Sequence, residues 1–125
     1  MLKLWGRVMA RLFWEDDIKL AWAPIYLEDF VQSRSNPDDI PFILEKIKEN
    51  YAAGKMFMVL YGETAGTVRG IVKCQNSQQL SKVCEVLEAT VVGDVCEFTQ
   101  QSGDTTEAGQ QAVEKLRKIF AEIAE

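Results

Sequence analysis

Three glycines spaced four residues apart, Gly62, Gly66 and Gly70, are the first residues in this sequence that could support a chemistry. Glycine-rich loops can cradle phosphates, but a phosphate-binding loop leads from a strand into a helix and carries Lys-Ser/Thr at its end. Here the flanking runs, 55–62 and 67–74, both have the length and composition of strands, and no Lys-Ser/Thr pair follows. The segment therefore predicts a β-hairpin whose glycines occupy turn positions with positive φ, and it predicts no nucleotide site.

The cysteines Cys74, Cys84 and Cys96 are separated by nine and eleven residues, without the close Cys-x-x-Cys pairs of zinc and iron–sulfur sites. The sequence contains no histidine, which excludes Ser-His-Asp and Cys-His catalysis and histidine-ligated zinc. We therefore expect buried structural thiols, no catalytic residue, no metal and no cofactor. An odd cysteine count, with basic residues interrupting any apolar signal sequence, favours a cytoplasmic location.

Several carboxylates could do acid–base work if the fold brings them together. Glu63 follows an apolar run, and Asp94 and Glu97 lie within another. The interpretation we favour is that they are solvated surface acids. The Asp38–Asp39 pair lies where a helix begins, and acids in a first turn complement the helix dipole, so we interpret it as structural.

A ligand site between sheet and helices is the main alternative function. Its polar groups would be Tyr26, Tyr61, Glu63 and Cys96. Such a protein would be a small-molecule-binding domain or a small enzyme that works without histidine. We favour a non-enzymatic role.

The segment 1–14 carries three basic residues and no acid, whereas the rest of the chain has a net charge of −8. In an extended strand, Trp5 would project on the same side as Arg7, Met9 and Arg11. Aromatic residues, methionine and arginine are enriched at the centres of protein interfaces. We therefore predict that Trp5, Arg7, Met9 and Arg11 form a partner-binding surface, which would steer an acidic partner protein towards Trp5.

The secondary structure of this segment is ambiguous, because its apolar residues fit both the alternation of a strand and the spacing of a helix. We favour a strand that pairs with the following segment across the turn "WEDD" (14–17). As a basic helix with aromatic residues it could instead associate with a membrane surface, which gives a third functional hypothesis. The apolar runs are too short for a membrane span, so an integral membrane protein is not expected.

The other elements are read from hydrophobic periodicity and capping residues. Helices are predicted for about 105–124, for a segment capped by Asn36 or Asp38 that ends before Gly54, and for 76–89 after Asn76 or Ser77, with a short helical turn after Tyr26. Strands are predicted for 18–27, 55–62, 67–74 and 90–100, with a possible bulge at Gly93. The last helix has Asp104 and Glu107 in the positions of a capping box.

This order predicts a single α+β domain over residues 1–125. Its sheet would be mostly antiparallel, with helices on one face and a ferredoxin-like β-α-β-β-α-β core from residue 18. The N-terminal segment and the C-terminal helix are additions to that core. A longin- or profilin-like α/β sandwich is the alternative architecture.

Composition narrows the function without identifying it. The chain is 47% hydrophobic with a net charge of −5, which is typical of a globular domain and unfavourable for binding nucleic acid. The leading hypothesis is a small, acidic, non-catalytic cytoplasmic module for protein–protein interaction: an adaptor, an assembly factor or a regulatory subunit. Its partner would be another protein, or a second copy of the chain in a homo-oligomer.

Overall fold

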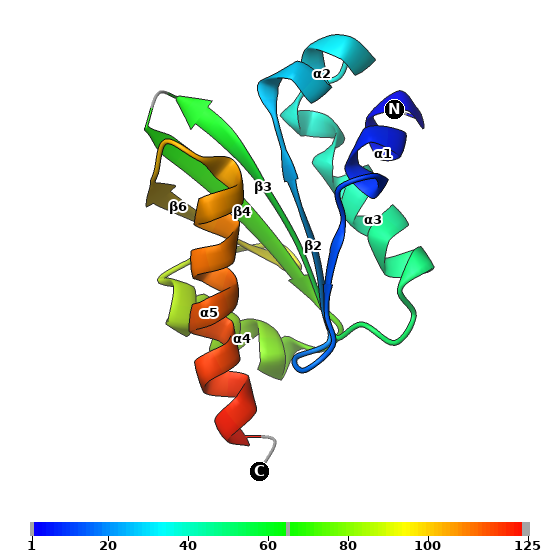
Figure 1. Cartoon of the computed structure of the whole chain (residues 1–125). Coiled ribbons are helices and arrows are strands. Elements are labelled where there is room, and N and C mark those ends of the chain that lie inside the picture. The colour runs from blue at the N-terminus through cyan, green and yellow to red at the C-terminus, as the bar shows by residue number, and fades with distance from the viewer. Residues whose placement is uncertain (1, 65, 124–125) are drawn as a thin grey trace.

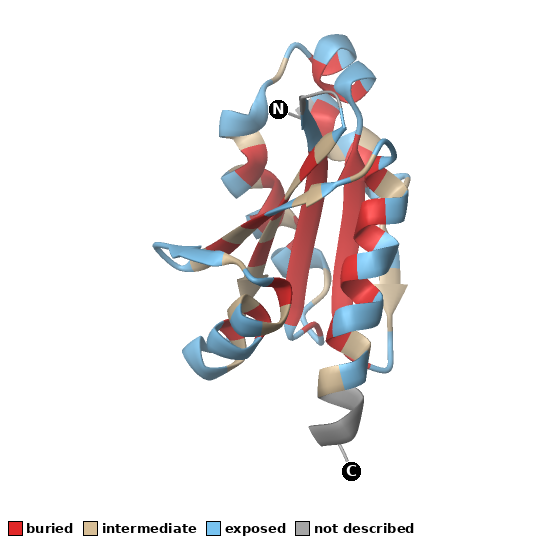
Figure 2. Ribbon diagram, turned by 90° about the vertical axis from the view of Figure 1, so that its left-hand side faces the viewer, coloured by how far each residue is buried: buried red, intermediate tan, exposed pale blue. Residues whose placement is uncertain are grey.

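The two central strands are continuous apolar runs, and most of the fold serves to bury them. The structure is a computed structural model that describes residues 2–64 and 66–123, with side chains for 3–63 and 66–119. Strands β2 (Leu20–Ile25) and β3 (Met56–Thr64) lie side by side and parallel. All six residues of β2 are buried, and Figure 2 shows both central strands covered along most of their length. Strands of this composition need cover on both faces.

One sheet contains all six strands, in the order β1-β2-β3-β4-β6-β5. Every neighbouring pair is antiparallel except β2 with β3. The remaining elements are α1 (Leu2–Met9), β1 (Phe13–Glu15), α2 (Leu27–Ser33), the 3-10 turn η1 (Pro37–Asp39), α3 (Ile40–Asn50), β4 (Thr67–Cys74), α4 (Ser77–Leu87), β5 (Thr90–Val92), β6 (Val95–Gln101) and α5 (Thr105–Ile123). The predicted α+β class with a mostly antiparallel sheet is confirmed.

Helices cover both faces of the sheet, whereas we had predicted them on one face. In Figure 1, α4 and α5 lie on one side and α1, α2 and α3 on the other. Alternate residues of the central strands point to opposite sides and form two cores. Leu20 and Trp22 belong to the core under α4 and α5, while Ala21, Ala23 and Ile25 belong to the core under α1 and α3. The reason is that β2 and β3 are apolar at successive positions, so a single covered face would leave half of their side chains in water.

The N-terminal segment is a helix, so the strand that we favoured there is wrong. Leu4 and Val8, one helical turn apart, are both fully buried against the sheet. An extended strand would have placed both side chains on one face as well, but it would not have given the helix α1 that packs on β2 on this side of the sheet. Only residues 13–15 form a strand, and β1 does pair with β2 across the predicted turn.

The β-α-β-β-α-β order predicted from residue 18 is present along the chain. In space, its two parallel strands β2 and β3 are direct neighbours, with α3 in the connection between them. The predicted strand 90–100 is a hairpin of two strands, β5 and β6. Gly93 adopts φ 64° at the turn between them, where we had expected a bulge.

The glycine segment forms the predicted β3–β4 hairpin. Of its three glycines only Gly66 has a positive φ, of 81°, so the expectation of turn positions for all three was too broad. Gly70 lies within β4 for a different reason. A Cβ atom there would lie 2.2 Å from Cζ of Phe98, so the residue must be glycine to let that ring cover the strand.

The predicted helices at the centre and the C-terminus are confirmed, because their start signals are local. Asn76 Oδ1 accepts the backbone N–H of Gln79 at 2.8 Å and caps α4. Asp104 Oδ1 accepts the N–H groups of Thr106 at 2.8 Å and Glu107 at 3.3 Å at the start of α5. The helix predicted from residue 38 begins at Ile40, after η1.

Candidate functional site

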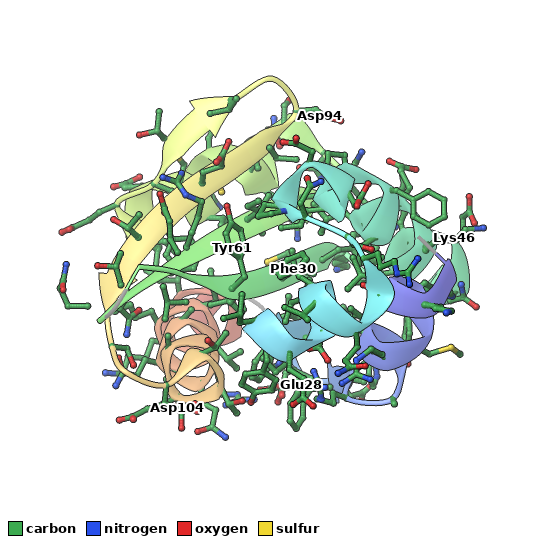
Figure 3. All side chains as sticks on the ribbon, turned by 90° about the horizontal axis from the view of Figure 1, so that it is seen from above. Glu28, Phe30, Lys46, Tyr61, Asp94 and Asp104 are labelled. Carbon is green, nitrogen blue, oxygen red and sulfur yellow. The ribbon has the colours of Figure 1, made fainter. Side chains whose placement is uncertain are left out.

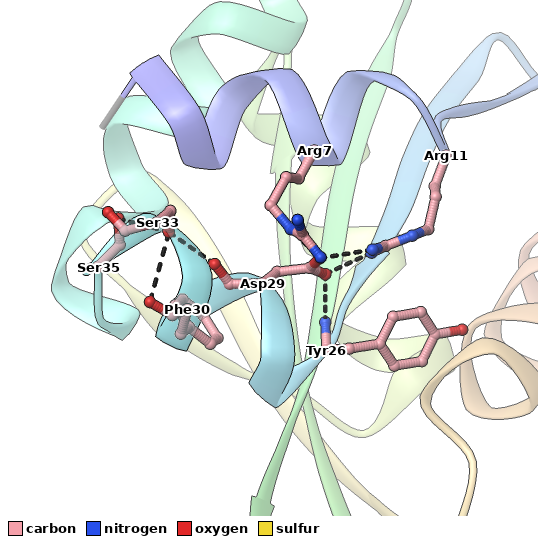
Figure 4. A network of polar contacts seen from close by, with 7 residues as sticks. All are labelled: Arg7, Arg11, Tyr26, Asp29, Phe30, Ser33 and Ser35. Carbon is pink, nitrogen blue, oxygen red and sulfur yellow. Dashed lines mark hydrogen bonds and ion pairs between the residues drawn. The ribbon is translucent and has the colours of Figure 1, made fainter.

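A buried carboxylate joins the first two helices. Asp29 lies in the first turn of α2 and its side chain is fully buried. Arg7 Nε donates to Asp29 Oδ1 at 2.8 Å, and the Arg11 guanidinium bonds both carboxylate oxygens. The backbone N–H of Tyr26 donates to Oδ2 at 2.8 Å (Figure 4). We call Arg7, Arg11 and Asp29 the arginine clamp, because it fixes α1 to α2.

The clamp holds Asp29 ionised. Burial by itself would raise the pKa of Asp29, but hydrogen bonds from Arg11, the Tyr26 backbone and Arg7 outweigh it and lower the pKa to about 2. The same bond to Asp29 raises the pKa of Arg11. A carboxylate with such a low pKa is a poor proton donor or acceptor near neutral pH, so the clamp is a structural ion pair rather than an acid–base catalyst.

The four residues predicted to bind a partner do not form one surface. Arg7 and Arg11 meet at Asp29, whereas Trp5 packs partly against the core under α1 and α3. Met9 is 51% exposed. The predicted common side depended on an extended segment. In a helix, residues four apart share a side, so Trp5 lies with Met9 and Arg7 lies on a different flank.

Exposed apolar side chains lie near the clamp, two of them on α2 and two at a hollow beside it, and the sequence analysis did not identify them. We call Phe13, Tyr26, Leu27 and Val31 the α2 patch. Leu27 is 77% and Val31 63% exposed, one turn apart on α2. Phe13 and Tyr26 line a hollow of about 290 Å³ together with Arg11, whose guanidinium lies 4.8 Å from the centre of the Tyr26 ring. The sequence does place Leu27, Phe30 and Val31 at helical spacing, which is a sign of an apolar helix side. Only the structure shows that Phe30 is buried while Leu27 and Val31 are exposed.

The groups suggested for a ligand site are dispersed. Tyr26 lies in the α2 patch, and Cys96 is buried in the core under α4 and α5. Glu63 Oε2 accepts from Arg69 Nε at 2.7 Å. Only Tyr61 lines a larger cleft, on the part of the sheet that faces α3.

The suggested acid pair is also accounted for by ion pairs. Glu63 and Glu97 both bond Arg69, and Asp94 bonds Lys73 at 3.1 Å. The hydrogen bond from Arg69 lowers the pKa of Glu63, and that from Lys73 lowers the pKa of Asp94. These ion pairs favour the ionised forms of Glu63 and Asp94.

Two of the three cysteines, Cys74 and Cys96, are poor nucleophiles. Burial raises the pKa of Cys74 and of Cys96 to about 12, so both thiols stay protonated near neutral pH. Cys84 donates its thiol hydrogen to the carbonyl of Ala89 at the end of α4. All three are free thiols.

Two further findings concern the described ranges, 2–64 and 66–123. No group of three or more histidine, cysteine, aspartate or glutamate side chains there is placed to hold a metal ion. Within the same ranges, no helix has the length and apolar character required to cross a membrane.

Comparison with known proteins relates this chain to others through its fold. No protein-family model matches the sequence, and no curated protein is recognisably similar to it. The chain is similar in structure to an exopolyphosphatase-related protein from Bacteroides fragilis, with a TM-score of 0.76 and 15% sequence identity. The match covers 99% of this chain but 36% of the other, so this chain spans about a third of that protein's length. At this identity the similarity establishes the fold and leaves the activity open.

Proposed function

We propose that this chain is a non-catalytic module that binds another protein through the α2 patch. The observation that carries the proposal is the exposure of Leu27 and Val31, at 77% and 63%, on one side of a single helix. Contiguous exposed apolar surface on a folded domain often marks a site of protein interaction. Tyrosine and arginine are enriched at interface hot spots, and the patch contains Tyr26 with Arg11 beside it.

The arginine clamp supports this reading, because it makes the patch rigid. Tyr26 N–H and two arginines hold Asp29, and Asp29 lies between Leu27 and Val31 on α2. A surface that is already ordered loses less conformational entropy on binding. The clamp has two positive charges and one negative charge, and Glu28 in the first turn of α2 adds a second negative charge beside Arg11.

The fold comparison is compatible with a module of this kind. In the exopolyphosphatase-related protein the matching fold forms 36% of the chain, so it stands there beside further polypeptide. A domain that works next to another protein segment needs a surface for it, and the α2 patch is our candidate for that surface. As a small adaptor or regulatory subunit with three free thiols, the protein would work in the reducing cytoplasm.

Membrane association through residues 1–14 has less support. The aromatic residues that would enter a lipid surface are Trp5, Phe13 and Trp14. Trp5 and Trp14 pack against the core under α1 and α3, and Phe13, 39% exposed, stacks on Trp22. Arg7 and Arg11 are engaged by Asp29. Insertion of the two tryptophans would require them to leave this core.

The test compares Leu27→Asp with Val91→Asp, a control that places the same charge at an exposed apolar residue of β5, outside the α2 patch. Affinity purification from native lysate should return a stoichiometric partner with wild type and with Val91→Asp, and Leu27→Asp should weaken its binding at least about tenfold. Light scattering shows whether the partner is a second copy. Equal binding by Leu27→Asp, or no stoichiometric partner for wild type, would contradict the proposal.

A further inference from the structure

A cleft of about 510 Å³ lies on the sheet face that α3 only partly covers. It is bounded by η1 and α3 on one side and by the β5–β6 hairpin on the other, with β3, β4 and β6 beneath it. In Figure 3, Tyr61 lies near the middle of this view and Asp94 at the tip of the hairpin. A cleft of this volume is in the range of small-molecule sites.

The floor and one wall of the cleft are apolar. Ile71 of β4 and Val95 of β6 are partly buried beneath it, and Ile40 and Leu44 of α3 form the wall. A ligand with a hydrocarbon body would therefore displace water from apolar surface, which favours binding.

The polar lining is strongly negative. Four carboxylates line the cleft, from Asp38, Glu45, Asp94 and Glu97, against the single ammonium of Lys73. Lys73 already bonds Glu45 and Asp94, and Glu97 bonds the guanidinium of Arg69 at 3.1 Å. Asp38 makes no ion pair with the residues that the structure describes. The lining side chains have a net charge of −3, or −2 when Arg69 is counted with its partner Glu97, so the cleft disfavours an anion such as phosphate and attracts a cation.

Tyr61 supplies a polar group that a ligand in the cleft can bond. Its side chain lines the cleft, and the residue as a whole is only 9% exposed. Its hydroxyl makes no hydrogen bond with any described residue and is open to the cleft rather than fully buried, so it is available to a ligand. Burial raises the pKa of Tyr61, so the hydroxyl is neutral and its oxygen can accept a hydrogen bond. Asp38 and Glu97 line the cleft together with Tyr61, and Glu97 bonds Arg69, the cross-strand partner of Tyr61 on β4.

We propose that the cleft binds a small organic cation, an aliphatic primary amine. Its ammonium group would donate to the Tyr61 hydroxyl and lie near the carboxylates of Asp38 and Glu97. Its methylene chain would lie over Ile71 and Leu44. The α2 patch consists of other elements, so this inference does not depend on the proposed partner surface.

The probe is 1,5-diaminopentane, titrated into the full-length protein labelled with ¹⁵N. We expect saturable chemical-shift changes at the amides of β3, β4 and β6 that border the cleft. Binding should weaken as salt is added, because charged groups dominate the recognition. 1,5-Pentanediol and glutarate have the same chain length without the positive charge, and neither should produce the saturable changes.

Two variants test the residues. Tyr61→Phe keeps the ring and removes the hydroxyl, and should weaken binding about 3- to 10-fold. Asp38→Asn keeps the size and removes a charge, and should weaken it about 2- to 5-fold. Tyr51→Phe removes a hydroxyl outside the cleft, and Glu107→Gln removes an exposed charge on α5. Both controls should bind as wild type does.

Nα-acetyl-lysine amide presents the ammonium group of a lysine side chain as it occurs in a protein. Tighter binding of this probe than of the diamine supports a lysine side chain as the source of the cation, and the reverse supports a free amine. The proposal is overturned if no saturable change occurs at millimolar diamine, if pentanediol or glutarate binds equally well, or if Tyr61→Phe binds as wild type does. Leu27→Asp should bind the diamine normally, which separates this result from a failure of the partner proposal.

Discussion

Asp29 is the one charged side chain that the described residues bury completely. A buried carboxylate is tolerated only when its oxygens are bonded, and donors from Arg7, Arg11 and Tyr26 meet this need. The arginines remain about one-third exposed, at 35% and 32%, so the clamp extends from the core to the surface. Removing the carboxylate would leave two cations side by side and one backbone N–H with a weaker partner.

We expect acid to destabilise the protein through this residue. The pKa of Asp29 is about 2 in the folded protein and about 3.9 in an unfolded chain. Because the folded pKa is depressed, ionised Asp29 contributes about 2 kcal/mol of stability above pH 4, and this contribution is lost as the pH falls towards 2. Between pH 4 and pH 2 the free energy of unfolding should therefore fall less for Asp29→Asn than for wild type, by about 2 kcal/mol. Urea unfolding at several pH values in this range measures the difference.

The same variant should be less stable than wild type near neutral pH, by roughly 2–4 kcal/mol, because it breaks a buried ion pair. Asp16→Asn is the control, since Asp16 is an exposed partner of Lys19. It should change the neutral stability little. If the free energy of unfolding of Asp29→Asn falls with decreasing pH as steeply as that of wild type, the clamp does not lower the pKa of Asp29.

At the scale of elements, the close approach of α5 to the sheet depends on Gly109. A Cβ atom at this position would lie 2.3 Å from Cζ3 of Trp22, a side chain that is almost fully buried in β2. The missing side chain lets the Trp22 ring lie directly beneath the helix. The indole N–H of Trp22 then donates to Glu15 Oε2 at 3.1 Å, which connects β2 to β1.

Gly109→Ala should therefore lower the free energy of unfolding by about 1–3 kcal/mol through overpacking, although alanine is the better helix former. The matched control is Gly6→Ala in α1, where no atom lies within 4 Å of the added Cβ. It should raise stability by about 0.5–1 kcal/mol. Chemical denaturation of the two variants measures both effects, and a stabilised Gly109→Ala would mean that Trp22 moves aside at little cost.

At the scale of the whole molecule, the two cores are joined through shared strands. Successive residues of β2 and β3 enter opposite cores, so neither core can lose its packing while the other retains both strands. Small domains of this construction usually unfold in one cooperative step.

We expect Ile43→Ala, on the buried side of α3, and Val83→Ala, on the buried side of α4, to lower the midpoint of the same single transition. Both side chains are fully buried, and the losses should be about 2–5 kcal/mol for the isoleucine and less for the smaller valine. Far-ultraviolet circular dichroism and tryptophan fluorescence should give coincident curves. Two separated transitions in either variant would mean that the faces fold independently.

The sequence by itself determined those elements whose signals are local. The helices α3, α4 and α5 were predicted from periodicity and from caps such as Asn76 and Asp104, and the β3–β4 hairpin from the glycines and two apolar runs. Each of these signals acts between residues a few positions apart, so the neighbouring sequence contains the whole interaction. The absence of histidine likewise excluded histidine-dependent catalysis and histidine-ligated zinc from the sequence alone, and the wide cysteine spacing argued against zinc and iron–sulfur sites.

The tertiary structure alone decided what depends on burial between distant segments. Leu4 and Val8 fit either a strand or a helix, and the need to cover the sheet over β2 selected the helix. The sequence analysis did not single out Asp29, because its partners Arg7 and Arg11 lie 22 and 18 residues away and only the fold brings them to it. The fold also decides that Leu27 is exposed and that Tyr61 is mostly buried beside a cleft. The amino-acid type fixes the polarity of a side chain, but only the packed fold determines its neighbours and whether water reaches it.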